Sequence, residues 1–354
     1  MCSFSRVRLF MLAGSSVLIW LLLSNPEAAA EGFAQGVHLC LRTLLPALFP
    51  FFVLCSFVAS LSSHKSSFFT ALLLSWLGGY AVCAGFVRDL SVQGKTDLRR
   101  AQLLLLLGCC SGPGFVIGSV GGQLMGSVRI GVVLYIAQLA ANLAAVLIMW
   151  PFTRHMICVK PQKSLCTHPE EKSMTFSDAI IGAVDTSMCV CGTVLFFRVI
   201  QAVLLQTVNW PSGLSPVVSG ILEISAGCAE YAQTGGPLAL HGICFCLSFL
   251  GLSVFLQLHA IIGNMVELRP LLLERLLHIP LMWLFTQGGL HLLPGESEAF
   301  SSMSPRIVAM NRAAPDASFV VFLFFCAVLY KIHKKIIIKS VMRNKRRRKV
   351  SSYV

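Results

Sequence analysis

The chain has 354 residues, of which 56% are hydrophobic and only 12% are charged, and its mean hydropathy is +0.77. Soluble domains usually carry about 25% charged residues, so this composition cannot supply a polar surface of ordinary size and excludes a soluble globular protein. The net charge is +13, and ten basic residues are concentrated in residues 331–349, directly after the apolar run 319–330. The predicted fold class is therefore an all-α polytopic membrane protein. Its basic tail is expected to bind anionic lipid on the cytoplasmic side, and no nucleic acid is expected as a partner.

The first 30 residues allow two interpretations. They contain Arg6 and Arg8, an apolar run at 9–23 and three alanines at 28–30. This pattern is typical either of a secretory signal with a small-residue cleavage site or of an uncleaved first membrane helix. On both interpretations Glu31 is expected on the outer side of the membrane, and without cleavage both termini are cytoplasmic.

Further hydrophobic runs are long enough to cross about 30 Å of hydrocarbon. They follow at residues 38–60, 130–150, 177–206, 270–293 and 318–332. Two other apolar regions, 68–126 and 215–263, are interrupted by small residues. We therefore expect about eight transmembrane helices together with re-entrant or broken segments. The polar stretch 151–175 contains three prolines and divides the chain into halves.

The two halves, residues 31–150 and 176–295, correspond in order. Segments 76–85, 111–122 and 129–150 parallel segments 220–230, 251–262 and 269–285, at an offset near 140 residues. A constant offset indicates an internal repeat even where identity is weak. Basic residues should place the N-terminus, the connections 88–100 and 151–175, and the tail in the cytoplasm, which predicts that the repeats are inverted. Residues 296–332 would then supply a loop and the last helix, and residues 333–354 the basic cytoplasmic tail.

The stretch 108–122, GCCSGPGFVIGSVGG, places six glycines and a proline between two hydrophobic runs. Unpaired backbone amides in hydrocarbon cost several kcal/mol, so a broken helix there must be covered by protein or line a polar cavity. Inverted repeats with broken helices are the usual architecture of a secondary transporter's central site, where half-helix N-termini face an anion. The alternative is that Gly118, Gly121 and Gly122 only allow close helix packing.

The candidate substrate-binding residues lie at and beside the predicted breaks: Gly79, Tyr80, Ser111, Gly112, Pro113, Gly114, Glu223, Gly251, Ser253 and Gln257. Glu223 is the strongest ionisable candidate, because a charge inside an apolar region is costly and often functional. Arg42, Asp185 and Arg198 are the other ionisable residues within apolar runs, and Arg198 is expected to extend toward a helix end. His259 is expected to be packed and hydrogen-bonded.

No enzyme, metal site or cofactor is predicted. The 14 cysteines are scattered through apolar segments, and their closest pairs lack the spacing of a zinc or haem site. The chain has no His-Glu-x-x-His motif, phosphate loop or Rossmann fingerprint, and neither Ser111 nor Ser219 has a base partner at a meaningful spacing.

Residues 78–143, together with 220–230 and 249–261, resemble the sporulation integral membrane proteins of the YlbJ type, which carry paired nucleoside-recognition (Gate) domains. The resemblance covers about residues 30–295, and that family is similar in its core to concentrative nucleoside transporters. It implies a bacterial protein of the mother-cell or outer forespore membrane that transports a small solute during spore formation. Dipicolinate is the implied cargo, and maturation of the spore cortex and core would depend on it.

This sequence departs from that family at two places. Residues 79–85, GYAVCAG, lack the proline and lysine of the family's Gly-Tyr-Pro-x-Gly-Ala-Lys, and Cys109 and Cys110 stand where the family tends to have asparagines. Two hypotheses follow. The first is a secondary transporter for a small anionic solute. The second is a non-transporting membrane scaffold for cortex or envelope assembly, with a second copy or other sporulation membrane proteins as its partners.

Overall fold

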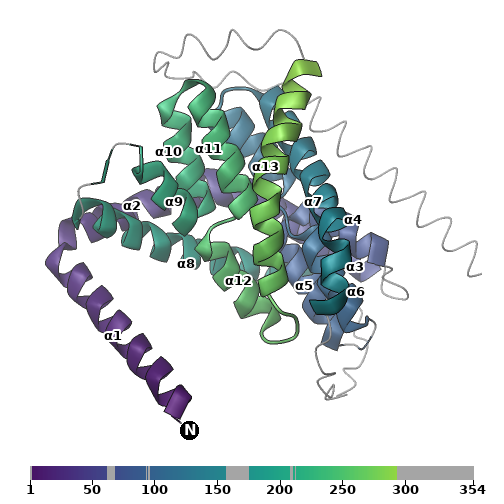
Figure 1. Ribbon diagram of the computed structural model, residues 1–354, viewed down its shortest axis with the longest axis horizontal. Helices are drawn as coiled ribbons and strands as arrows, with labels where there is room; N and C mark the ends of the chain where they lie inside the picture. The colour runs from purple at the N-terminus through teal and green to yellow at the C-terminus, as the bar shows by residue number, and fades with distance from the viewer. Residues whose placement is uncertain are drawn as a thin grey trace, which may run out of the picture. The chain divides into compact units, whose positions relative to one another are not determined.

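The computed structural model describes residues 2–61, 68–92, 94, 96–156, 175–207, 210–211 and 213–292. Contacts divide the chain into the units Met1–Arg306 and Ile307–Val354, and the second unit lies outside the described residues, as do the predicted last helix and the basic tail. Within the described ranges every regular element is a helix (Figure 1), so the predicted all-α class is confirmed.

Four helical stretches are long and apolar enough to cross a membrane: Pro26–Val58, Val128–Trp150, Phe176–Thr207 and Gly236–Ile262. Three shorter apolar helices, Leu12–Ser24, Phe68–Gly78 and Gly114–Leu124, accompany them. The helix α13 (Arg269–Leu292) has 24 residues, about 36 Å of helix, but carries charged residues within its length. These findings confirm a polytopic membrane protein, and the number of about eight crossings stays a prediction.

The N-terminal region forms helix α1 (Cys2–Ser24) and helix α2 (Pro26–Leu39), which continues through the π-helical turn η1 (Cys40–Leu44) into α3 (Leu45–Leu61). Helix α2 packs along α8 (Phe176–Thr207). Ala28, Gly32 and Gly36 are buried at every fourth position of α2, and a Cβ at Gly32 would lie 2.7 Å from the Cβ of Ala202. Small residues here allow close approach of two helices, and the alternative of a cleavage site stays a prediction.

The same succession of elements occurs twice in the described chain. After α3 come α4 (Phe68–Gly78), α5 (Tyr80–Val92), α6 (Leu98–Gly108), the π-helical segment η2 (Gly114–Leu124) and α7 (Val128–Met156). After α8 come α9 (Ser215–Leu222), α10 (Ile224–Thr234), α11 (Gly236–Phe249), α12 (Leu252–Ile262) and α13. Each half therefore has two interrupted helices before one long helix. The interruptions fall at Gly79 and 109–113, and at Glu223 and 250–251. The inverted orientation of the halves stays a prediction.

Corresponding helices of the two halves contact each other. Helix α3 packs against α8, and α7 packs along α13, which Figure 1 shows as neighbouring teal and light green helices. Helix α5 of the first half also packs against α12 of the second. The two halves are therefore in contact through their long helices and through parts of their interrupted helices.

Of the glycines predicted to allow close helix packing, Gly121 has this role and Gly118 does not. A Cβ at Gly121 of η2 would lie 2.4 Å from the Cα of Gly131 on α7, so the two backbones touch. Gly118 is exposed, and a Cβ there would meet no atom within 4 Å. The close contact between η2 and α7 therefore depends on position 121.

We predict that Gly121→Ala lowers the free energy of unfolding by about 1–3 kcal/mol, because the added methyl group must push two helices apart. Thermal unfolding of the detergent-solubilised protein measures this effect. Gly118→Ala is the matched control and should leave the unfolding temperature unchanged. Equal effects of the two substitutions would contradict the packing role of Gly121.

Candidate functional site

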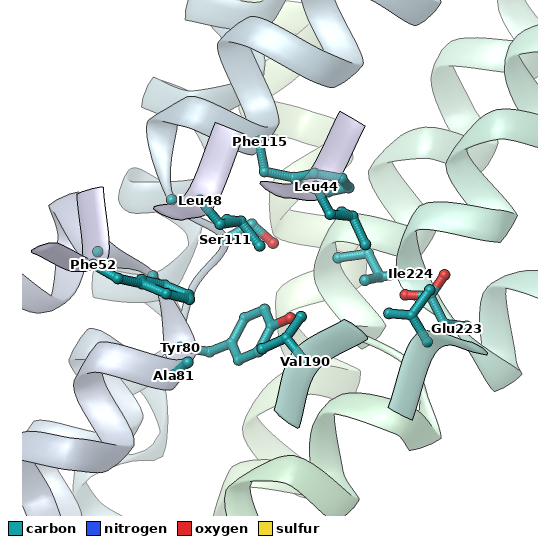
Figure 2. Close-up of a pocket in the computed structure, with 14 residues that line it drawn as sticks. Leu44, Leu48, Phe52, Tyr80, Ala81, Ser111, Phe115, Val190, Glu223 and Ile224 are labelled. Atoms are coloured by element: carbon teal, nitrogen blue, oxygen red, sulfur yellow. The ribbon is translucent and has the colours of Figure 1, made fainter. Parts of the chain in front are cut away.

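A pocket lies where the interrupted helices of both halves meet (Figure 2). Its empty space amounts to about 390 Å³, part of it open to the outside. The walls come from η1 and α3, from α8 and from three of the four interruptions. The lining residues are Leu44, Leu48, Phe52, Gly78, Gly79, Tyr80, Ala81, Ser111, Gly112, Phe115, Val190, Val194, Glu223 and Ile224. Five of the ten predicted site residues are among them: Gly79, Tyr80, Ser111, Gly112 and Glu223.

Three half-helices begin at this pocket. Helix α5 starts at Tyr80, η2 starts at Gly114, two residues after the pocket residue Gly112, and α10 starts at Ile224. The first turn of a helix has backbone N–H groups without helical partners and carries the positive end of the helix dipole. The convergence of three such ends in a mainly apolar pocket favours a negatively charged or strongly polar group there.

Glu223 occupies one of these three helix ends. Its side chain is 1% exposed, and its Oε2 accepts a hydrogen bond of 2.7 Å from the backbone N–H of Ala226 and another from the hydroxyl of Ser225. Glu223 is therefore the N-cap of α10 and compensates the positive end of that helix from within the chain. The pocket residues at the starts of the two first-half helices, Tyr80, Ser111 and Gly112, bring no carboxylate.

Within each half the two interruptions touch each other, and a glycine with positive φ stands at each contact. Gly79 has φ +80°, and a Cβ there would lie 3.0 Å from the backbone nitrogen of Gly112. Gly251 has φ +82°, and a Cβ there would lie 3.1 Å from the backbone nitrogen of Ile224. Both positions require glycine because the conformation is left-handed and the neighbouring backbone is close.

Side chains of α7 satisfy the backbone groups that the interrupted helices leave without helical partners. Three polar side chains donate to such carbonyl oxygens: Tyr135 to Trp76 at 2.9 Å, Gln138 to Ser111 at 2.9 Å, and Asn142 to Leu107 at 2.7 Å. Their spacing of three and four residues places them on one face of the helix. An apolar environment makes such bonds obligatory, so this polar face of α7 allows the first-half breaks to exist.

Ser111 differs from the other polar groups of the pocket. Its side chain is 1% exposed, and its hydroxyl has no hydrogen-bond partner among the described residues. A buried hydroxyl without a partner costs about 1–3 kcal/mol. Ser111 therefore combines a place in the pocket lining with a hydroxyl that makes no hydrogen bond to the described residues.

The other five predicted site residues lie beside the pocket. Pro113 is the buried N-cap of η2, and a Cβ at Gly114 would lie 2.1 Å from the carbonyl oxygen of Ala47, so Gly114 serves packing against α3. Gly251 contacts the backbone of Glu223 and Ile224, where α9 ends and α10 begins. Ser253 and Gln257 are buried on α12, and Gln257 donates to the hydroxyl of Thr193 on α8.

The remaining ionisable candidates do not reach the pocket lining. Arg198 lies 3.7 Å from the carboxylate of Glu230 and donates to Gln35 and Gln201, each at 2.9 Å; its extension toward a helix end stays a prediction. Arg42 and Asp185 are exposed on their helices. His259 is also exposed, so the prediction that it is packed is wrong.

Three polar residues of α13 are buried and were not predicted from the sequence. Glu274, Arg275 and His278 are each 0% exposed and lie next to the polar face of α7. Two features of the sequence could have indicated these residues. All three lie inside a hydrophobic helix, and Arg275 and His278 stand 140 residues after Tyr135 and Gln138, which is the repeat offset.

We predict that Gln138→Met lowers the free energy of unfolding by about 1–3 kcal/mol, because the buried carbonyl of Ser111 loses its donor. Ile136→Met is the matched control on the opposite face of α7, where Ile136 is 61% exposed. Urea or thermal unfolding in detergent measures both variants. If Gln138→Met were as stable as the control, this hydrogen bond would not support the break.

No family model and no solved structure matches the chain. Among curated proteins it is similar to the "Sporulation integral membrane protein YlbJ" of Bacillus subtilis (strain 168). The two are 23% identical over 313 residues, which cover 72% of this chain and 76% of the relative. The relative is named as a sporulation integral membrane protein, and the long apolar helices of this chain agree with the membrane part of that description.

Proposed function

From its homology to the YlbJ-type sporulation integral membrane proteins, we propose that the chain works as a secondary transporter for a small anionic solute. The cargo that the resemblance implies is dipicolinate, and the membrane is the outer forespore membrane. The observation that carries the proposal is the pocket at the junction of interrupted helices from both halves, with three half-helix N-termini at its wall.

The residue types of the pocket lining match the groups of a flat aromatic dicarboxylate, and the pocket would have to widen to admit it. Phe52, Phe115, Leu44 and Leu48 offer apolar surface for a ring, and the helix starts of α5 and η2 offer two places for carboxylate groups. The hydroxyl of Ser111, which lies just before η2, supplies a hydrogen-bond donor in the pocket lining. Glu223 is the one charged residue of the lining and repels a dianion, so the carboxylate groups of the solute would bind at the starts of α5 and η2 and not at the start of α10.

The contacts between the halves suggest the motion by which the chain would transport a solute. Inverted repeats that contact each other through corresponding helices can rock against one another around a central site. In the described residues the contacts of α3 with α8 and of α7 with α13 have this relation. The chain has no nucleotide-binding fingerprint, so an ion gradient or trapping of the solute inside the forespore would supply the energy.

We predict that Ser111→Ala leaves the protein folded and membrane-inserted but weakens dipicolinate binding about tenfold or more, which is the value of one hydrogen bond to a charged acceptor. Equilibrium binding of dipicolinate to the purified protein measures the effect. Ser187→Ala is the matched control, because Ser187 is also a buried hydroxyl without a partner among the described residues but lies outside the pocket lining. Equal affinities for the two variants would contradict the proposed site.

The second candidate function is a membrane scaffold for spore-envelope assembly, favoured by the ten basic residues at 331–349. Spore dipicolinate content in a strain lacking the protein separates the two functions when the strain is complemented with variants. A transporter requires low content with Ser111→Ala and restored content with the chain truncated after residue 330. A scaffold docked through its tail requires the reverse pattern.

A further inference from the structure

A second polar cluster lies outside the pocket, where α13 packs along α7. Glu274 and Arg275 are both 0% exposed, and the Arg275 Nε donates to the Glu274 Oε2 at 2.5 Å. The Nη2 of Arg275 donates across the helix interface to the amide oxygen of Asn142 on α7. Ionisable side chains at such depth are costly, so this pair is a candidate for function.

The ion pair is incompletely satisfied. Glu274 Oε1 and Arg275 Nη1 are buried and have no hydrogen-bond partner among the described residues. A buried carboxylate oxygen without a donor leaves much of its charge uncompensated. This oxygen is therefore a place where a proton can be added without displacing any of the hydrogen bonds that the pair makes.

His278 lies one turn further along α13, and its partners fit two protonation states. Its Nε2 lies 3.1 Å from the backbone carbonyl oxygen of Gln138, and because a carbonyl only accepts, Nε2 carries a proton. Its Nδ1 lies 2.9 Å from the hydroxyl of Ser248, which can donate to Nδ1 or accept from it. The ring can therefore hold one or two protons without losing a partner.

The cluster is linked by hydrogen bonds to the breaks of both halves. Asn142 and Gln138 donate to the carbonyls of Leu107 and Ser111 beside the first-half break. Ser248 stands two residues before Leu250, where the second-half break begins. A change of charge in the cluster can therefore reach the backbone of the pocket through one or two side chains.

We propose that Glu274 Oε1 is a proton-binding site, and that a proton bound there favours binding of the anionic solute in the pocket. The added proton forms an O–H bond on the carboxylate and breaks no covalent bond. With His278 neutral, the cluster changes from zero net charge to +1, and this positive charge attracts an anion beside Ser111. The first part stands by itself, whereas the coupling to solute rests on the proposed function.

Glu274 is the single acid at this helix interface, because α6, α7 and α11, which pack against α13, contain no Asp or Glu. These elements and the adjoining break contain other titratable or charged residues. They are Arg129, Tyr135, Arg154 and His155 on α7, His241, Cys244 and Cys246 on α11, Arg99 and Arg100 on α6, and Cys109 and Cys110 at the break. None of these side chains has a carboxyl group, so none of them gives the infrared carbonyl band of a protonated carboxyl group.

The first test is an infrared titration of the purified full-length protein in liposomes. A carbonyl band of a protonated carboxyl group should increase as the pH falls, and Glu274→Gln should remove it. Glu267→Gln, an exposed residue seven positions earlier, is the matched control and should retain it. Glu223→Gln identifies any part of the carbonyl band that comes from the pocket carboxyl group. If Glu274→Gln is unstable, Glu274→Asp keeps a carboxyl group and should shift the midpoint of the band. An unchanged band in both Glu274 variants would overturn the proton site.

The second test measures dipicolinate binding to the same liposomes across that pH range. Protonation should raise the affinity about fivefold or more, the lower end of typical coupling between sites, and the Glu274→Gln protein should lose this pH dependence. A band that depends on Glu274 without any dipicolinate binding would reject the proposed cargo and leave the proton site standing. Binding with the same pH dependence in Glu274→Gln would overturn the coupling.

Discussion

The structure depends on one constraint: backbone N–H and C=O groups within an apolar environment must find partners. Four helices of the described chain are interrupted, and each interruption leaves carbonyl oxygens without helical donors. At the two breaks of the first half, the polar face of α7 meets this demand with Tyr135, Gln138 and Asn142. Without that face the breaks would be too costly, and without the breaks no half-helix would begin at the pocket.

Much of the architecture could be predicted from the sequence, because its signals are local. Hydrophobic length predicts α7, α8 and α13 within a few residues of their observed bounds. Small residues in apolar surroundings predict the interrupted regions, and the constant offset predicts which interruptions correspond. The predicted break at Gly251 differs only slightly from the observed one, since the chain leaves the helix at Leu250 and α12 begins at Leu252.

The remaining features depend on contacts between distant segments, which no local pattern contains. Residues 270–293 were expected to be an ordinary span, because hydropathy averaged over a helix conceals Glu274, Arg275 and His278. The partners of Arg275 and His278 on α7 are more than 130 positions earlier in the chain. The role of Glu223 as a helix cap was equally hidden, because it follows from the backbone angles at that one residue.

The glycine at each contact between two breaks also decides which break can carry a side chain at that contact. In the first half Gly79 of the first break meets Gly112, whereas in the second half Gly251 of the second break meets Glu223 and Ile224. One left-handed glycine is thus enough to let two interrupted helices touch. The opposite position is then free to carry a side chain, and in the second half this freedom has placed a carboxylate in the pocket. Two halves with the same succession of breaks thereby form a pocket whose one charged lining residue comes from the second half.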